Sequence, residues 1–299
     1  FNVNNHAHIL QGTELCTTEW FYYYFQHKNI FNSLTRQGAG RYKLTKSALE
    51  KMKIKYPTIK EQEKIVEILS TWDSAIEKQE QLIEKKKEFK KGLMQRLLSG
   101  EVRFKEFKDE WKCKCLGEFL DENKEKTLSQ DECEILTSSR SGMYFQKDYF
   151  SKEVASKNNI GYRIIYKGDF TYRAMSDDGN FTFNRNNLID KGCVSPAYSV
   201  FKVKENTNAE FINYILNSNI FSKEIKKCIQ GGTRLALRYS ELVKIKIIVP
   251  EIQEQEKIAK MLTAVDREIE LLEKELEALK LQKKGLMQRL LTGEVRVKV

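Results

Sequence analysis

Side chains that can hydrogen-bond to the edges of DNA bases recur in turn-rich stretches of this 299-residue sequence. Arginine pairs bidentately with guanine, and asparagine or glutamine pairs with adenine, so these residue types on exposed loops are candidate base contacts. In the second half of the chain the candidates are Ser138, Ser139, Arg140, Tyr144, Arg173, Arg185, Asn186, Thr233, Arg234 and Arg238. Near the start of the chain they are Gln37, Arg41 and Lys43. For any one arginine a solvated surface charge is the simpler explanation, and only the cluster as a whole favours a DNA-binding surface.

Residues that would perform catalysis on DNA are scarce in this sequence. Only three prolines occur, and none is followed by Pro or Asp, so the Asn/Asp-Pro-Pro-aromatic motif of an amino-methyltransferase and the Pro-Asp start of a nuclease site are both absent. There is no P-loop. Asp169 and Asp177-Asp178 could hold a magnesium ion, but paired acids beside glycine are more typical of turns. The C-x-C pair Cys113 and Cys115 lacks the second pair of a zinc site. We therefore expect no catalysis, no metal and no cofactor in this chain.

Two copies of one unit organise the chain. Residues 37–105 match residues 230–298 at a constant offset of 193, and 37 of the 69 positions are identical. Upstream the similarity continues at an offset of 190, which would make Tyr24 the counterpart of Tyr214. The second copy has about 80 further residues, 111–190, without a counterpart in the first. We therefore expect the chain to begin in the middle of its first lobe.

Each copy contains a long stretch with the apolar spacing of a coiled-coil helix. Ile65 and Leu69 begin a 3-4 heptad register in the first copy, and Ile258 and Leu262 begin the same register in the second. About 40 residues at 1.5 Å each would make a rod of roughly 60 Å. The first helix leads from one lobe to the other and the second helix starts there, so we expect the two to pack antiparallel. The C-terminal residues 294–299 should then pack on the first lobe.

Local signals mark the ends of both helices. Thr58 and Glu61 have the spacing of a capping box directly after Pro57. Gly100 and Gly293 follow the last apolar pair of each helix, where glycine commonly ends a helix.

The segment between the long helices predicts a mixed domain with a curved sheet. Short β-like runs at 162–166, 169–172 and 198–203 alternate with glycine and asparagine turns, and one helix is expected over 209–227. The expected fold class is α+β: two mixed α/β lobes, related by a pseudo-two-fold axis and joined by a long antiparallel two-helix coiled coil.

The balance of charge favours a polyanionic partner. The net charge is +10, with +5 over residues 1–57 and zero over 251–299, so the excess lies mainly outside the expected helices. Nothing approaches 18 consecutive apolar residues, and the first residues lack the basic and apolar runs of a signal peptide. We therefore expect a cytoplasmic protein without a membrane partner.

Short motifs recur in a fixed order along the chain. A proline with an isoleucine after it, a Glu-Gln-x-Lys-Ile block, a long heptad helix and a Leu-Leu-x-Gly-x-x-Arg ending occur in both copies. Between the helices lie Trp111, Leu116-Gly117-Glu118, Tyr162–Phe170 and Gly192–Tyr198. The first set resembles the conserved regions of type I restriction-modification specificity subunits, and the second is similar to their target-recognition domains. The resemblance covers nearly the whole chain.

The resemblance implies a division of labour among parts of the chain. Residues 1–57 would be the C-terminal part of a first target-recognition domain and 107–249 a complete second one. Residues 58–106 and 250–299 would be the conserved spacer helices, the latter with a C-terminal strand. Each target-recognition domain would read one half of a bipartite site in double-stranded DNA.

The resemblance also implies partners. The helices would dock two methyltransferase subunits, and restriction or translocase subunits would join through them. S-adenosylmethionine, ATP and magnesium would then be bound by those partners.

Two alternatives stay open for the function. A structural coiled-coil interaction protein would explain the helices but would leave the lobe of about 140 residues without a role. The chain could also be the specificity module of a related DNA methyltransferase defence system. The Gln-Gly-x-x-Arg pattern shared by 37–41 and 230–234 favours a backbone or phosphate contact common to both lobes, because lobes with different targets would not share their discriminating residues.

Overall fold

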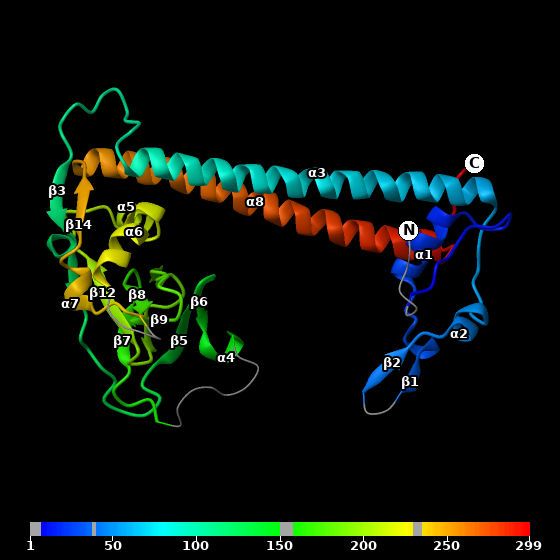
Figure 1. Ribbon diagram of the computed structural model, residues 1–299, viewed down its shortest axis with the longest axis horizontal. Coiled ribbons are helices and arrows are strands. Elements are labelled where there is room, and N and C mark those ends of the chain that lie inside the picture. Colours follow the sequence, from blue (N-terminus) through cyan, green and yellow to red (C-terminus); the bar gives the residue numbers. More distant parts are fainter. Residues whose placement is uncertain (1–6, 38–39, 150–157, 230–234) are drawn as a thin grey trace. The chain divides into compact units, whose positions relative to one another are not determined.

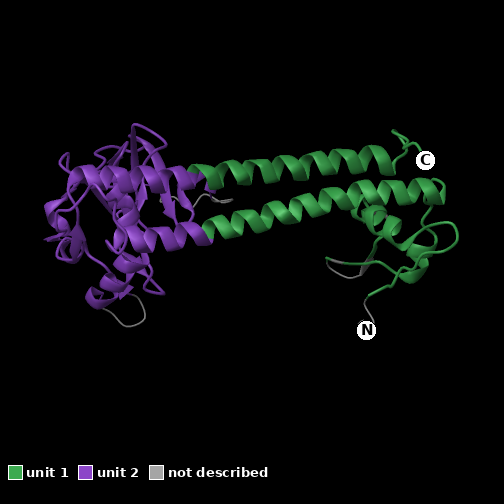
Figure 2. Ribbon diagram, turned by 90° about the horizontal axis from the view of Figure 1, so that it is seen from above, with its two compact units in different colours: residues 1–87, 267–299 green, residues 88–266 purple. Residues whose placement is uncertain are grey.

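The computed structural model describes residues 7–37, 40–149, 158–229 and 235–299. Its contacts divide the chain into two compact units (Figure 2). Unit 1 comprises residues 1–87 and 267–299, and unit 2 comprises residues 88–266. The boundary falls within both long helices, so each unit holds a segment of each. The described chain is α+β, as the sequence predicts.

The two long helices are α3 (Ile59–Leu98) and α8 (Ile252–Leu291), each of 40 residues (Figure 1). Within unit 1 they run antiparallel, because Glu80 of α3 pairs with Lys280 of α8 at 2.9 Å while Lys86 pairs with Glu268 at 2.7 Å. Within unit 2, Lys90 forms an ion pair with Asp266. The heptad pattern thus predicted the antiparallel helix pair correctly.

The ends of the long helices agree with the sequence signals in part. Gly100 and Gly293 have φ values of 74° and 77°, a left-handed conformation that favours glycine and ends each helix. The capping box predicted from Thr58 and Glu61 is wrong. The Glu61 carboxylate accepts hydrogen bonds from the guanidinium of Arg296 instead, at 2.6 and 2.5 Å.

Unit 1 packs short elements on its segments of the long helices. These are α1 (Thr18–His27), η1 (Phe31–Ser33), β1 (Thr35–Gln37), β2 (Arg41–Lys43) and α2 (Lys46–Glu50), with β1 and β2 antiparallel. Tyr23 of α1 shares a buried cluster with Ile65 and Leu69, against which Val295 and Val297 pack. The expectation that the C-terminal residues pack on the first lobe is therefore confirmed, but the expected C-terminal strand is wrong, because residues 292–299 form no strand.

Unit 2 contains most of the β-structure. Its strands are β3 (Lys112–Cys115), β4 (Leu120–Glu122), β5 (Glu134–Ser139), β6 (Gly142–Phe145), β7 (Arg163–Tyr166), β8 (Phe170–Arg173), β9 (Met175–Ser176), β10 (Asn184–Arg185), β11 (Lys191–Val194), β12 (Tyr198–Val203), β13 (Leu235–Ala236) and β14 (Lys246–Val249). Its shorter helices are η2 (Leu116–Glu118), α4 (Gln146–Tyr149), α5 (Ala209–Leu216), α6 (Asn219–Cys228) and α7 (Tyr239–Leu242).

Two four-stranded sheets form the centre of unit 2. One has the order β10-β8-β12-β4 and is antiparallel throughout; the other has the order β6-β5-β11-β7, in which only β11 and β5 run parallel. Phe170 and Phe201 stack in the core at 5.5 Å between ring centroids. The three strands expected from the sequence are present. The single helix expected over 209–227 is two helices, because the Ser218 hydroxyl accepts from the Phe221 N–H and starts α6.

The internal repeat is preserved in the contacts of both units. The Tyr23 hydroxyl donates to Asp73 at 2.7 Å, and the Tyr214 hydroxyl donates to Asp266 at 2.6 Å. The two aspartates lie at the repeat offset of 193, so the counterpart of Tyr214 is Tyr23, not Tyr24. The offset predicted for this helix was therefore wrong by one residue, because identities in the loop after α1 do not fix the register of the helix.

Candidate nucleic-acid interface

A polar pocket of about 380 Å³ opens on unit 2 at the tip of the β5–β6 hairpin. Its lining is rich in hydroxyl, amide and charged side chains and includes three aromatic rings. The lining residues are Thr137, Ser138, Ser139, Arg140, Tyr149, Arg173, Met175, Ser176, Asp177, Asn180, Phe181, Thr182 and Tyr198. Four of the residues predicted to contact DNA are among them: Ser138, Ser139, Arg140 and Arg173.

Cross-strand hydrogen bonds fix the hairpin that forms one wall. The side-chain amide of Asn184 on β10 donates to the Ser138 hydroxyl and to the Ser139 carbonyl, both at 2.7 Å. The Tyr198 hydroxyl of β12 donates to the Ser138 carbonyl at 3.3 Å. At the tip, Tyr144 donates to the Ser141 carbonyl at 3.1 Å. The wall is therefore held by both sheets and presents its polar groups in a defined geometry.

Asp178 binds two residues that line the pocket, Ser176 and Asn180. Its carboxylate accepts from the Ser176 hydroxyl at 2.9 Å and from the backbone and side-chain N–H groups of Asn180 at 3.1 and 3.0 Å. It also accepts from the Arg140 guanidinium at 2.5 Å. These donors, with the Asn180 backbone N–H foremost, hold the pKa of Asp178 well below its usual range. The carboxylate is thus charged at neutral pH and keeps Arg140 at the pocket.

Arg173 differs from Arg140 in having an unengaged guanidinium. It ends β8, opposite Tyr198 of β12, and its side chain is exposed. Across the described ranges it has neither a hydrogen bond nor an ion pair. All five of its N–H donors are therefore available to a ligand.

Two of the predicted DNA contacts form hydrogen bonds within the lobe. Asn186 is fully buried, and its amide closes a turn by donating to the Ile189 carbonyl at 2.9 Å and accepting from the Leu188 N–H at 3.1 Å. Arg185 donates to the Gly168 carbonyl at 3.1 Å and pairs with Glu210 at 2.5 Å. Asn186 is thus held inside the lobe, whereas Arg185 uses two of its five N–H groups here; contact of these two residues with DNA stays a prediction.

The remaining predicted residues lie outside this pocket or outside the described ranges. Arg238 is exposed at the start of α7, and Lys43 is exposed on β2 of unit 1. Gln37 and Arg41 are paired across β1 and β2, and the structure describes only their backbone. Thr233 and Arg234 lie outside the described residues.

Sequence reasoning missed four polar residues of this region: Ser176, Asn180, Thr182 and Asn184. Asn180 and Asn184 have the side chain that pairs with adenine and lie between two predicted strands, so the residue type was a usable signal. Asp178 was considered only as a turn former or metal ligand, and the first of these roles agrees with its bonds to Asn180.

Comparisons with known proteins agree with this picture. The family described as "Type I restriction modification DNA specificity domain" matches residues 1–85 and 108–281. The chain belongs to this family. It is 28% identical over 96% of its length to the type I restriction enzyme MjaVIII specificity subunit of Methanocaldococcus jannaschii, of which it covers 72%. It is likewise 28% identical over 92% of its length to the putative MjaX specificity subunit of the same organism, of which it covers 67%.

Solved specificity subunits share the fold. A structure of the HsdS subunit from Thermoanaerobacter tengcongensis matches with a TM-score of 0.50 at 16% identity, over 94% of this chain and 72% of that one. The type I S subunit from M. genitalium matches with a TM-score of 0.55 at 17% identity, over 91% of this chain and 72% of that one.

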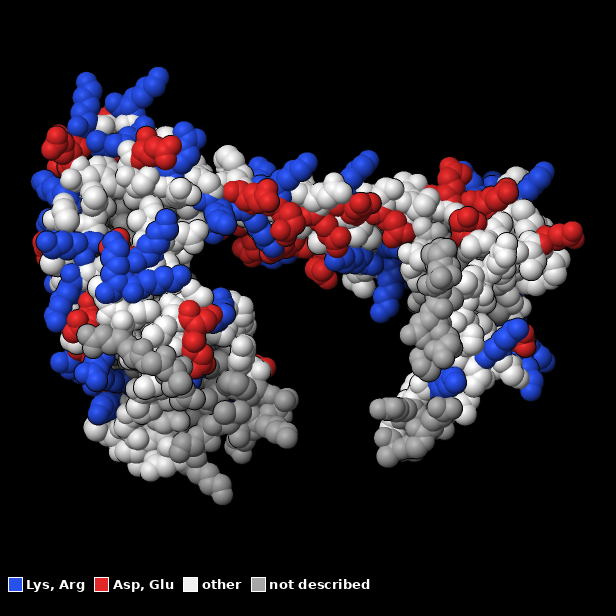
Figure 3. Space-filling view, viewed as in Figure 1, with Lys and Arg blue, Asp and Glu red and all other residues white. Residues whose placement is uncertain are grey.

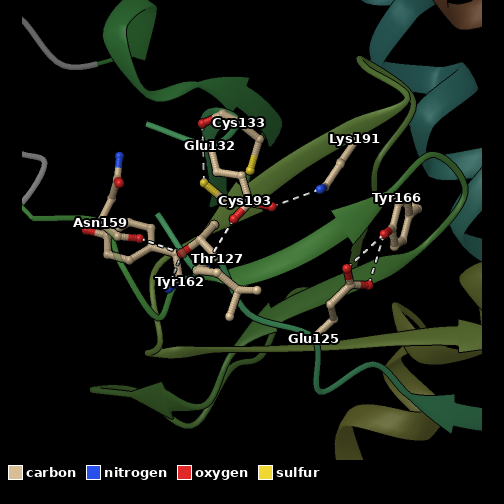
Figure 4. Close-up of polar contacts among 10 residues, drawn as sticks. Glu125, Thr127, Glu132, Cys133, Asn159, Tyr162, Tyr166, Lys191 and Cys193 are labelled. Carbon is tan, nitrogen blue, oxygen red and sulfur yellow. Dashed lines mark hydrogen bonds and ion pairs between the residues drawn. The ribbon is translucent and has the colours of Figure 1, made fainter. Parts of the chain in front are cut away.

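A second polar cluster in this specificity-domain protein serves the fold (Figure 4). Tyr166 donates to Glu125, and Lys191 pairs with Glu132 at 2.9 Å. The Cys193 thiol donates to the Cys133 carbonyl at 3.6 Å, and burial raises the pKa of Cys193. These residues hydrogen-bond to one another or form ion pairs with one another. No group of three potential metal ligands occurs within the described part of the chain.

Unit 1 has a pocket of a different kind. It measures about 440 Å³ and is lined by apolar and neutral residues of α1 and by Leu10, and it includes no charged residue. Phe21 and Phe25 line it; their counterparts at the α1 offset of 191, Ile212 and Leu216, are buried in the core of unit 2. This pocket of unit 1 therefore differs in character from the polar pocket of unit 2.

Charge on the long helices is mixed. Figure 3 shows acidic and basic side chains intermingled along them. Many are paired across the helices, as in Lys87 with Glu273 at 2.8 Å. No described helix is long and apolar enough to traverse a bilayer.

Proposed function

We propose that this chain recognises DNA sequence as the specificity subunit of a type I restriction-modification complex, and that the polar pocket of unit 2 reads one half of a bipartite site. The observation that carries the proposal is the convergence of Arg140, Arg173 and neutral hydrogen-bonding groups on one concave surface of a specificity-domain fold. Base edges present both donors and acceptors, and a pocket with both kinds of group matches them.

The chain's role is recognition without catalysis. Asp178, beside the pocket, accepts hydrogen bonds from Ser176, Asn180 and Arg140, which suits a positioning role better than that of a base or metal ligand. S-adenosylmethionine, ATP and magnesium would be bound by partner subunits. Since its target is chromosomal DNA, the chain would act in the cytoplasm.

Methyltransferase subunits would dock on the long helices. Leu271 and Leu281 lie on α8 in unit 1, where α8 pairs with α3. Their side chains are nevertheless 65% and 71% exposed. These two leucines are candidate contacts for a methyltransferase subunit. Two methyltransferase subunits would bind in this way, and restriction or translocase subunits would join through them.

A domain exchange tests the proposal. The chain is co-expressed with its host's methyltransferase subunits, and the methylated sequence is determined by methylome sequencing. Replacing residues 107–249 by the corresponding domain of a relative should change one half-site and leave the other half-site and the gap unchanged. Binding of the complex to its site should also weaken steeply with salt, because neutralised phosphates release counterions. An unchanged methylated sequence after the exchange would refute the assignment of reading to unit 2.

A further inference from the structure

The two arginines that line the unit 2 pocket differ in their contacts. Arg140 is 72% exposed but tethered by the Asp178 carboxylate. Arg173 has no partner within the described ranges and projects from the end of β8, whose neighbour β12 supports it in the antiparallel sheet. The Arg140 guanidinium is therefore held by the Asp178 carboxylate. The Arg173 guanidinium extends from a strand and is available to a ligand.

The surroundings of Arg173 suit a base edge better than a phosphate. Asp177 and Asp178 both line or border the pocket, and negative charge next to a bound phosphate would be repulsive. The Ser139 hydroxyl and the Asn180 amide supply both donors and acceptors, which are the groups that distinguish one base pair from another. Since the Arg140–Asp178 pair is close to neutral, the pocket offers directional hydrogen bonds more than bulk positive charge.

We infer that Arg173 is a specificity-determining residue that reads a guanine in the half-site recognised by unit 2, and that Asp178 positions Arg140 beside it. The inference rests on the proposed function and names the base that the pocket selects. A free guanidinium donates two parallel hydrogen bonds to O6 and N7 of guanine from a rigid planar fork, whereas a lysine ammonium reaches the same atoms without that fixed geometry. The half-site of unit 2 must accordingly contain at least one G·C pair.

The first test separates base reading from phosphate binding at Arg173. The complex with its methyltransferase subunits is titrated with duplexes in which each position of the unit 2 half-site carries each of the four base pairs. Arg173→Lys keeps the charge, and we expect it to lose roughly tenfold to a hundredfold of the preference for G·C at one position. The slope of affinity against salt should not change.

Arg238→Ala is the matched control, since Arg238 is also exposed but is not among the pocket residues. It should weaken binding to all duplexes to a similar extent. Arg173→Gln is a second variant with the same expected loss of preference for guanine. If Arg173→Lys keeps the full preference and only lowers affinity uniformly, or if no position of the half-site prefers G·C, the inference is overturned.

The second test concerns the positioning role of Asp178. Asp178→Asn and Arg140→Ala should each reduce discrimination at the same base position, and the double variant should be no worse than either single one. Equal melting temperatures would separate this result from a general loss of structure. Additive effects, or effects spread evenly over all positions, would contradict the positioning role.

Failure of this inference differs from failure of the proposed function. If the wild-type complex shows no sequence preference, or if exchanging residues 107–249 leaves both half-sites unchanged, the proposed function itself fails. If the exchange changes one half-site but Arg173→Lys leaves discrimination intact, only the assignment of Arg173 fails.

Discussion

Removing one hydroxyl from each unit tests whether the repeat anchors both lobes in the same way. Tyr214 of α5 donates to Asp266 of α8 at 2.6 Å, and Lys90 of α3 pairs with the same carboxylate. In unit 1, Tyr23 donates to Asp73, which pairs with Lys283. Tyr214→Phe and Tyr23→Phe each delete one donor and leave the aromatic ring in place.

The structure sets the expected size of both effects. A hydrogen bond to a charged group contributes about 1.5–3 kcal/mol. The side chains of Asp266 and Asp73 are 38% and 41% exposed, so water can replace part of each lost bond. We therefore expect each variant to lose about 1–2 kcal/mol, with Tyr214→Phe toward the upper end because the Tyr214 hydroxyl also shares a hydrogen bond with the Thr263 hydroxyl at 3.2 Å.

Hydrogen exchange read by mass spectrometry separates the peptides of α1 and α5 and is the suitable assay. A loss of 1–2 kcal/mol corresponds to a fall in protection of roughly 5- to 30-fold. Tyr22→Phe is the control, because Tyr22 of the same helix is 59% exposed and its hydroxyl has no hydrogen bond among the described residues. The reasoning is refuted if the control loses as much protection as Tyr23→Phe. It is also refuted if Tyr214→Phe and Asp266→Asn are additive in a double-mutant cycle.

Three further predictions concern the core, acid stability and DNA affinity. Leu262 and Leu69 are both fully buried, so replacing either by alanine leaves a cavity. In urea unfolding, Leu262→Ala should destabilise unit 2 by about 3–5 kcal/mol, and Leu69→Ala should destabilise unit 1 by less because the cluster around Leu69 is smaller and can relax further. Equal losses of stability would argue against this explanation. Hydrogen bonds from Arg296 lower the pKa of Glu61, so the stability that this carboxylate contributes is complete above its ordinary pKa and is lost as the pH falls through the lowered value. The melting temperature of Glu61→Gln should therefore fall less than that of the wild type as the pH is lowered through this range. If both proteins show the same pH profile, Glu61 does not contribute to acid stability in this way. Arg238→Ala should reduce the salt slope of DNA binding by about 0.9 if Arg238 contacts one phosphate, and an unchanged slope would remove it from the interface.

The helices and the repeat could be predicted because they depend on local periodicity. The heptad spacing from Ile65 and from Ile258 requires only that apolar residues recur on one face, and each predicted helix is present. The capping box at Glu61 failed because a distant guanidinium competes for the same carboxylate. A partner so distant in sequence cannot be inferred from the residues near Glu61.

The DNA-facing residues were only partly predictable, for the same reason. In sequence, Arg173 and Arg185 look alike, since both lie at strand ends in turn-rich stretches. Glu210 and the Gly168 carbonyl bind two of the N–H groups of Arg185, whereas Arg173 has no partner among the described residues. Asn186 likewise has the residue type of a base reader but is fully buried in its own turn. Only the tertiary partners separate a reader from a structural residue.

The repeat itself distinguishes the scaffold from the reading surface. Arg103 donates to the buried Glu254 at 3.0 and 2.7 Å, and Arg296 donates to the buried Glu61 at the corresponding positions 193 residues apart. Contacts that hold the segment after one long helix to the start of the other are thus present twice. Arg140, Asp178 and Arg173 lie outside the segments that match between the two copies. Residues that both copies share cannot by themselves distinguish two different half-sites, so the duplicated Arg–Glu contacts are better explained as part of the fold of each unit than as contacts that read sequence.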